Sequence, residues 1–86
     1  TITRQQMAVM LSRFARLIGI DTSAEKAALM QFSDGADTGI WAMDGVAWCV
    51  KTGILQGKGG NVLDPTAQVS RAEIAVMFNR LITLIK

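Results

Sequence analysis

ITRQQMAVMLSRFARLI at residues 2–18 recurs as VSRAEIAVMFNRLITLI at residues 69–85, and the two stretches align without a gap. Seven of the seventeen aligned pairs are identical, and most of the others are conservative. The offset of 67 residues suits a helical repeat that includes its connecting loops. We therefore expect the chain to begin inside one repeat unit and to end at the same point of the next, as an internal or processed fragment would.

Both copies have the pattern of an amphipathic helix that begins with a capping box. Thr3 is followed three residues later by Gln6, and Ser70 by Glu73, so that each side chain can bond the other's backbone N–H. The pattern predicts helices over residues 3–18 and 70–85. Their apolar residues recur at i, i+3, i+4 and i+7, as one buried helix face requires: Met7, Met10, Leu11, Phe14, Leu17 and Ile18, and then Ile74, Met77, Phe78, Leu81, Leu84 and Ile85.

A third helix is predicted from about Ile40 to Thr52, ended by Gly53 in the left-handed conformation. Residues 23–30 carry a weaker helical pattern, and residues 32–39 and 56–61 are loops. Residues 54–55 and 62–63 are extended pieces too short to make a sheet. The expected fold is all-α: a small bundle of helix–loop–helix repeats with at most very short extended pieces, in which both end helices pack on the Ile40–Thr52 helix.

The composition argues against catalysis. The chain of 86 residues has no histidine and one cysteine, which removes the commonest general base and any cysteine-based zinc site. Nine basic and seven acidic residues are scattered along the chain, and no apolar run approaches the roughly 20 residues of a membrane span. We expect no enzyme, cofactor or metal, and no nucleic acid or membrane as a partner. Cys49 lies in an apolar helix and is expected to be a small buried hydrophobe.

Arg4 and Arg71 each follow a cap residue, at the first position of a helix. A cation there faces the positive end of the helix dipole, so propensity alone would favour an acid. The same helix start presents unpaired N–H groups that attract anions, and the arginine fork binds a carboxylate or phosphate through two hydrogen bonds. Two interpretations are open: an anion site on two equivalent surfaces, or a structural side chain that is solvated or paired with a nearby aspartate such as Asp34.

Five short motifs follow one another in a set order across residues 32–77. They are Phe32-Ser-Asp34, Trp41-Ala42, Gly53-Ile54-Leu55-Gln-Gly57, Leu63-Asp-Pro65, and Val69-Ser-Arg71-Ala-Glu73 with Ala75 and Met77. This order resembles the S-layer homology (SLH) domain, whose repeat has a Phe-x-Asp start, a Trp-Ala helix, a Gly-Ile-x-x-Gly turn, a Phe-x-Pro segment and a Thr-Arg-Ala-Glu helix start. By this resemblance residues 32–86 are a complete repeat, residues 21–31 an inter-repeat linker and residues 1–20 the closing helix of a preceding repeat.

The resemblance implies a non-catalytic module that anchors an exported protein to the bacterial cell surface. Its ligand would be an anionic, often pyruvylated, secondary cell-wall polysaccharide, and its other partners further SLH repeats or other copies of the chain. The alternative is a protein–protein assembly module that oligomerises through exposed helix faces, and we expect the fragment to self-associate or to be poorly stable alone. The ligand-binding residues implied by the motifs, by repeat equivalence and by the chemistry of the side chains are Arg71, Arg4, Glu73, Gly57, Trp41 and Asp34.

Three of these residues have competing structural interpretations. Trp41 lies seven residues before Trp48, hence on roughly the same helix face, and is either core or a platform for a sugar ring. Asp34 either turns its loop or orients an arginine. Gly57 lets a sugar approach the backbone, or simply makes a turn.

Overall fold

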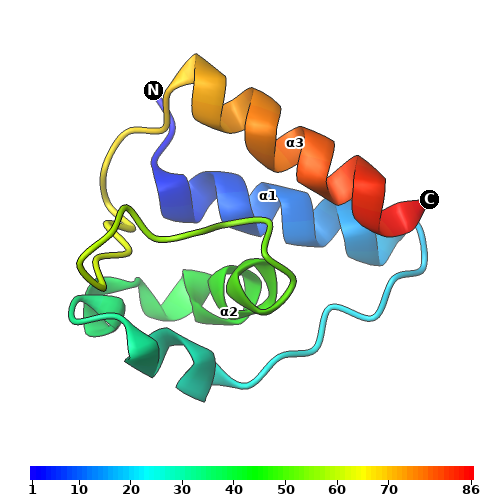
Figure 1. Ribbon diagram of the computed structural model, residues 1–86. Helices are drawn as coiled ribbons and strands as arrows, with labels where there is room; N and C mark the ends of the chain where they lie inside the picture. The colour runs from blue at the N-terminus through cyan, green and yellow to red at the C-terminus, as the bar shows by residue number, and fades with distance from the viewer.

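The computed structural model describes residues 1–86 and is all-helical, as the sequence predicts (Figure 1). The α-helices are α1 (Arg4–Leu17), α2 (Met43–Lys51) and α3 (Arg71–Ile85), and no strand is present. Extended pairing is limited to one bridge between Thr3 and Gln68, and no helix has the length and apolarity to span a membrane. Three short 3₁₀ helices precede α2, over Lys26–Gln31, Gly35–Asp37 and Ile40–Ala42.

Both predicted capping boxes are present and fix where the long helices begin. The Thr3 hydroxyl accepts from the Gln6 N–H at 3.2 Å, and the Gln6 amide oxygen accepts from the Thr3 N–H at 2.8 Å. Ser70 and Glu73 make the same reciprocal pair, at 3.1 Å in each direction. Two of the four orphan N–H groups of each helix start are thereby satisfied locally.

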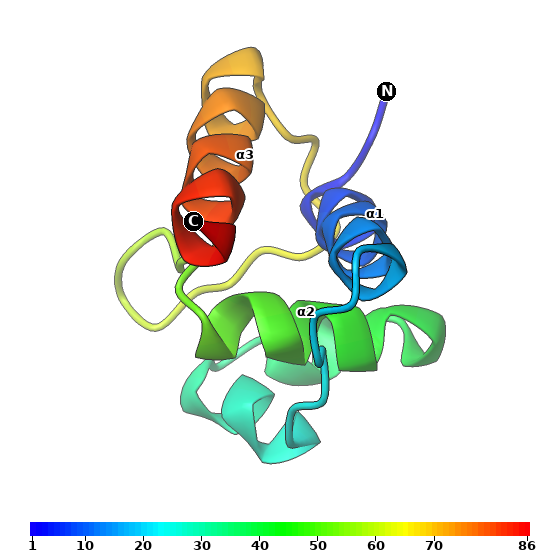
Figure 2. The same cartoon turned by 90° about the vertical axis from the view of Figure 1, so that its right-hand side faces the viewer.

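The core forms where α1 crosses α2 at close range (Figure 2). A Cβ on Gly45 would lie 3.1 Å from the Val9 Cα, so only glycine lets the two backbones approach this closely. Ala8 and Ala15 of α1 are completely buried for the same reason. The Cys49 thiol of α2 donates to the Ala8 carbonyl at 3.5 Å, which makes it part of this contact.

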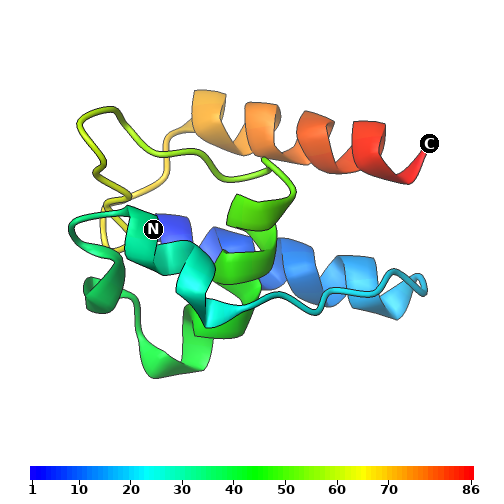
Figure 3. The same cartoon turned by 60° about the horizontal axis from the view of Figure 1, so that its bottom comes forward.

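The third helix does not pack on α2, contrary to the expectation that both end helices would. α3 lies against α1 and beside the turn that follows α2 (Figure 3). The Arg80 guanidinium donates to the Ile54 carbonyl at 3.3 Å, and Met77 and Leu81 join the core from this side. The reason is the size of α2. Its nine residues are already covered by α1 and the Lys26–Gln31 helix, so α3 is held one layer further out.

The predicted Ile40–Thr52 helix is divided in two, and this separates the tryptophans. Residues Ile40–Ala42 form a 3₁₀ turn before α2, which changes the angular spacing between residues. Trp48 is 2% exposed in the core, whereas Trp41 is 59% exposed, with its ring lying over Gly39. The expectation that both rings share a face was therefore wrong, and the assignment of Trp48 to the core was right.

Other local predictions hold with small changes. Gly53 ends the helix at φ +82°, as expected for a left-handed cap. The weak helical pattern at 23–30 appears as the 3₁₀ helix Lys26–Gln31, and the loop at 32–39 contains the short turn Gly35–Asp37. Residues 54–55 and 62–63 form no strand pair.

The two tryptophans give a matched test of this core. Trp48→Ala should lower the free energy of unfolding by about 3–5 kcal/mol, because it empties a fully buried site. Trp41→Ala should change it by less than about 1 kcal/mol, because the ring is mostly in water. Thermal or urea unfolding followed by circular dichroism measures both, with the milder Trp48→Phe as a second variant. Equal losses at the two positions would contradict the described packing.

Candidate ligand-binding groove

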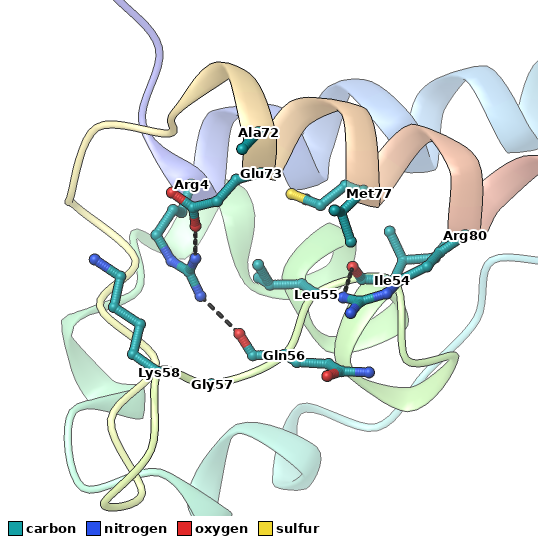
Figure 4. A pocket seen from close by; sticks show the side chains of 11 residues that line it. Arg4, Ile54, Leu55, Gln56, Gly57, Lys58, Ala72, Glu73, Met77 and Arg80 are labelled. Atoms are coloured by element: carbon teal, nitrogen blue, oxygen red, sulfur yellow. Dashed lines mark hydrogen bonds and ion pairs between the residues drawn. The ribbon is translucent and has the colours of Figure 1, made fainter.

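Arg4 is buried at the point where α1, α3 and the loop between α2 and α3 meet. Its side chain is 4% exposed and pairs with the Glu73 carboxylate of α3. Its Nε donates to the Leu63 carbonyl at 3.1 Å. A terminal nitrogen donates to the Gln56 carbonyl at 2.7 Å, as Figure 4 shows. Three acceptors, two from the loop and one from α3, thus satisfy one buried charge, as burial of a cation requires.

The start of α1 is fixed by the same loop. The Arg4 N–H donates to the Ala67 carbonyl at 2.8 Å, and the Gln5 N–H donates to the Pro65 carbonyl at 2.9 Å. These N–H groups at the helix start were predicted to be unpaired and able to bind an anion. In α1 they are already paired inside the protein, so the helix start itself is closed to a ligand.

Arg71, the repeat counterpart of Arg4, is in a different environment. It is exposed, forms no salt bridge and makes no side-chain hydrogen bond. The two arginines are therefore not on equivalent surfaces, and no Arg71–Asp34 pair exists. Identical positions in the repeat have different roles here because, within residues 1–86, the acceptors that surround Arg4 have no counterparts beside Arg71.

Glu73 serves both its own helix cap and Arg4. Desolvation is the largest single influence on its pKa and raises it. The Ser70 N–H and the Arg4 charge outweigh this and hold the pKa of Glu73 below its ordinary value. The carboxylate is therefore ionised at neutral pH and fixed in position at the start of α3.

Asp34 ties the loop together rather than contacting an arginine. Its two carboxylate oxygens accept from the Leu63 and Asp64 N–H groups, each at 2.8 Å. The Leu63 hydrogen bond is the largest cause of the lowered pKa of Asp34, with a smaller contribution from the Arg4 charge. By holding Leu63, Asp34 positions the carbonyl that Arg4 Nε binds.

A cavity of about 310 Å³ lies beside Arg4, between the first half of α3 and the turn at residues 54–58 (Figure 4). We call it the Arg4 groove. Its charged lining has three cations, Arg4, Lys58 and Arg80, against one acid, Glu73. The other lining residues are Ile54, Leu55, Gln56, Gly57, Ala72, Val76 and Met77.

Gly57 lines this groove, but an internal contact already explains why it is glycine. A Cβ there would lie 2.7 Å from the Phe32 ring and 2.9 Å from the Val62 carbonyl oxygen. Any side chain would therefore push the turn away from Phe32. One side of the turn at 54–58 therefore packs against Phe32, and its other side lines the groove.

The structure brings together three of the six residues expected at the ligand: Arg4, Glu73 and Gly57. Arg71, Trp41 and Asp34 lie outside this lining. Gln56, Lys58 and Arg80 also line the groove and were not predicted there. A signal for Arg80 was available, because Arg13 and Arg80 are an identical pair in the repeat; no signal pointed to Lys58.

Cys49 is not available for chemistry. Burial raises the pKa of its thiol to about 12, so the thiolate is absent at neutral pH. This agrees with its expected role as a small buried side chain.

The arginine pair offers a controlled test of the buried ion pair. Arg4→Ala should destabilise the protein by about 3 kcal/mol or more, because it leaves Glu73 and two loop carbonyls without their donor. Arg71→Ala removes the same side chain from the same helix position and should change stability by less than about 0.5 kcal/mol. Chemical denaturation of both variants measures the difference. A stable Arg4→Ala protein would overturn the assigned role of Arg4.

The lowered pKa values also predict acid sensitivity. A carboxyl with a lower pKa in the folded state contributes stability that is complete above its unfolded pKa, near roughly pH 4, and lost as the pH falls through the folded value. The melting temperature should therefore fall below about pH 4. Asp34→Asn should lower stability at pH 7 and make the acid decline shallower, whereas Asp37→Asn, an exposed neighbour, should leave stability at pH 7 unchanged. An unchanged acid decline in Asp34→Asn would contradict the loop contacts of Asp34.

Comparisons with known proteins agree with the order of motifs in the sequence. The family model of the S-layer homology domain matches residues 31–75. The chain is 32% identical over 85 residues to Cell surface glycoprotein 1 of Acetivibrio thermocellus; the match covers 99% of this chain and 4% of that protein's length. No solved structure matches the chain. The chain belongs to the S-layer homology domain family, which consists of non-catalytic modules that generally anchor surface proteins to the cell wall.

Proposed function

We propose that the Arg4 groove binds an anionic secondary cell-wall polysaccharide and so tethers an exported protein to the bacterial surface. The observation that carries the proposal is the charge of the groove: three cations surround it, and its one acid is already paired with Arg4. A carboxylate on a sugar, such as a ketal-linked pyruvate, is the chemistry that this excess of positive charge fits.

Arg80 and Lys58 are the residues proposed to contact the anion. Arg80 is half-buried and uses one N–H on the Ile54 carbonyl, so most of its planar fork is free to bind a carboxylate through two hydrogen bonds. Lys58 lies at the rim, where its ammonium group is 3.0 Å from an Asp64 carboxylate oxygen. That ion pair is solvent-exposed and weak, so breaking it to bind a ligand costs little free energy.

The three expected residues in the groove are proposed to hold its walls in position and not to be the main ligand contacts. They are Arg4, Glu73 and Gly57. Three of the five N–H donors of Arg4 are already bound within the protein. The Arg4 charge is balanced by the Glu73 carboxylate, so Arg80 and Lys58 supply the net positive charge of the groove. The Glu73 carboxylate and the exposed polar edge of the 54–58 turn can meet sugar hydroxyls.

The family supports this proposal at a coarser level. S-layer homology domains bind cell-wall polymers, and the similar protein named above is a cell surface glycoprotein, which together suggest a cell-surface location. Trp41 remains a candidate for stacking on a sugar ring outside the groove, because its ring is mostly exposed and lies next to Gly39, which has no side chain.

Co-sedimentation with purified wall polysaccharide tests the proposal. Arg80→Ala should weaken binding about tenfold or more, as expected when a hydrogen-bonded charge contact is lost. Lys58→Ala should weaken it by a smaller factor, since Lys58 is more exposed. Lys26→Ala is the matched control, because it removes one exposed positive charge from the far side of α2.

A second arm of the same experiment identifies the anion. Polysaccharide from which the pyruvyl groups have been removed should bind the unmodified chain weakly, and Arg80→Ala should then cause little further loss. Equal binding of both polysaccharides, or equal losses for Lys26→Ala and Arg80→Ala, would overturn the groove as the anion site.

A further inference from the structure

We infer that a second subsite, which adjoins the Arg4 groove at Arg80, takes a neutral sugar linked to the anionic one. The inference rests on the proposed function of the Arg4 groove and extends it from one charged group to a short stretch of polysaccharide. Its basis is a second cavity that shares part of its lining with the first.

This second cavity lies between the end of α2 and the second half of α3, and we call it the Asn79 subsite. Its volume is about 340 Å³, close to the 310 Å³ of the Arg4 groove. Both volumes are at the lower end of the range for small-molecule sites, roughly 300–1,000 Å³. The polar side chains that line the Asn79 subsite are Thr52, Gln56, Asn79, Arg80 and Thr83, and Leu84 is its one apolar side chain.

The two cavities are contiguous because Arg80 and Gln56 line both of them. Arg80 donates to the Ile54 carbonyl, which holds its guanidinium beside the turn that borders both cavities. The backbone carbonyl of Gln56 accepts from Arg4, whereas the Gln56 side chain extends the other way, toward Arg80 (Figure 4). A ligand made of linked units, as a polysaccharide is, can therefore fill both cavities at once.

The Asn79 subsite differs from the Arg4 groove in charge. Arg80 is its one charged side chain, and that charge is already assigned to the anion in the Arg4 groove. The remaining polar side chains are two amides and two hydroxyls, from Gln56, Asn79, Thr52 and Thr83. Such uncharged groups both donate and accept hydrogen bonds, as sugar hydroxyls do. A neutral sugar is therefore the class of ligand that this lining fits.

These side chains have unused hydrogen-bonding capacity. The Asn79 amide is exposed, and the one hydrogen bond from a side chain to Asn79 goes to its backbone carbonyl. The Thr52 and Thr83 hydroxyls each donate at 2.9 Å to the backbone carbonyl four residues earlier, so their oxygens can still accept. The Gln56 amide nitrogen donates to the Gly53 carbonyl at 3.4 Å, and the amide oxygen has no partner. Donors and acceptors are thus available to a sugar without breaking a short internal hydrogen bond.

Calorimetric titration with two fragments of the purified wall polysaccharide tests the inference. One fragment is the single pyruvylated sugar, and the other is the same sugar with its adjoining neutral sugar. The unmodified chain should bind the two-sugar fragment at least about fivefold more tightly, because the second sugar adds hydrogen bonds in the Asn79 subsite.

Variants of the two cavities should separate the fragments. Asn79→Ala should weaken binding of the two-sugar fragment about threefold to tenfold, because one neutral hydrogen bond is lost. It should change binding of the one-sugar fragment by less than about twofold. Thr83→Val keeps the shape of the side chain without its oxygen and should act in the same direction, whereas Arg80→Ala should weaken binding of both fragments.

The control for Asn79→Ala is Gln31→Ala, which removes an exposed side-chain amide outside both cavities. It should leave the affinity for both fragments unchanged. Asn79 and Thr83 are exposed on α3, so their variants should fold normally, and circular dichroism checks this.

Equal affinity of the unmodified chain for the two fragments would overturn the Asn79 subsite and leave the Arg4 groove as the anion site. So would an Asn79→Ala chain that binds both fragments normally, or one that loses affinity for both equally. Failure of either fragment to bind the unmodified chain would instead overturn the proposed function, and the Asn79 subsite with it. The two failures are therefore distinguishable.

Discussion

The buried Arg4 guanidinium is the interaction on which the arrangement of the chain depends. It joins α1 to the Gln56 and Leu63 carbonyls of the loop and to Glu73 of α3. Backbone hydrogen bonds from the start of α1 to Pro65 and Ala67 act at the same junction. A buried cation is tolerated only when its donors are paired, so the loop between α2 and α3 must adopt the path that presents those carbonyls. Asp34 reinforces this path by binding the Leu63 and Asp64 N–H groups from the other side.

The same interaction shapes the proposed binding site. Pairing Glu73 with Arg4 removes the one acid of the groove from competition with a ligand, and it leaves Arg80 and Lys58 as the accessible cations. Stability and binding are therefore coupled at this point. A change at Arg4 should act on both, whereas a change at Lys58, whose ion pair is solvent-exposed, should act mainly on the proposed binding. Arg80 also donates to the Ile54 carbonyl, so the stability of its variants has to be measured beside their binding.

The two closing helices show that one sequence can have two structural outcomes. α1 and α3 begin with the same capping box and carry apolar residues at the same offsets. Their burial is nevertheless complementary, since α1 packs on α2 whereas α3 packs on α1 and beside the turn at residues 54–55. The neighbouring segments therefore decide which face of each helix is buried.

The sequence by itself determined the helices, their caps, the Gly53 stop, the burial of Trp48 and the family, because these depend on local pattern and on motif order. It did not predict that Arg4 would be buried and Arg71 exposed. Nor did it predict that α3 would pack away from α2, or that Lys58 would line the groove. Those features depend on segments up to 69 residues apart along the chain, as in the Arg4–Glu73 pair. Only the tertiary structure brings such segments together. Two copies of the same local sequence therefore do not reveal which copy will contact a distant segment.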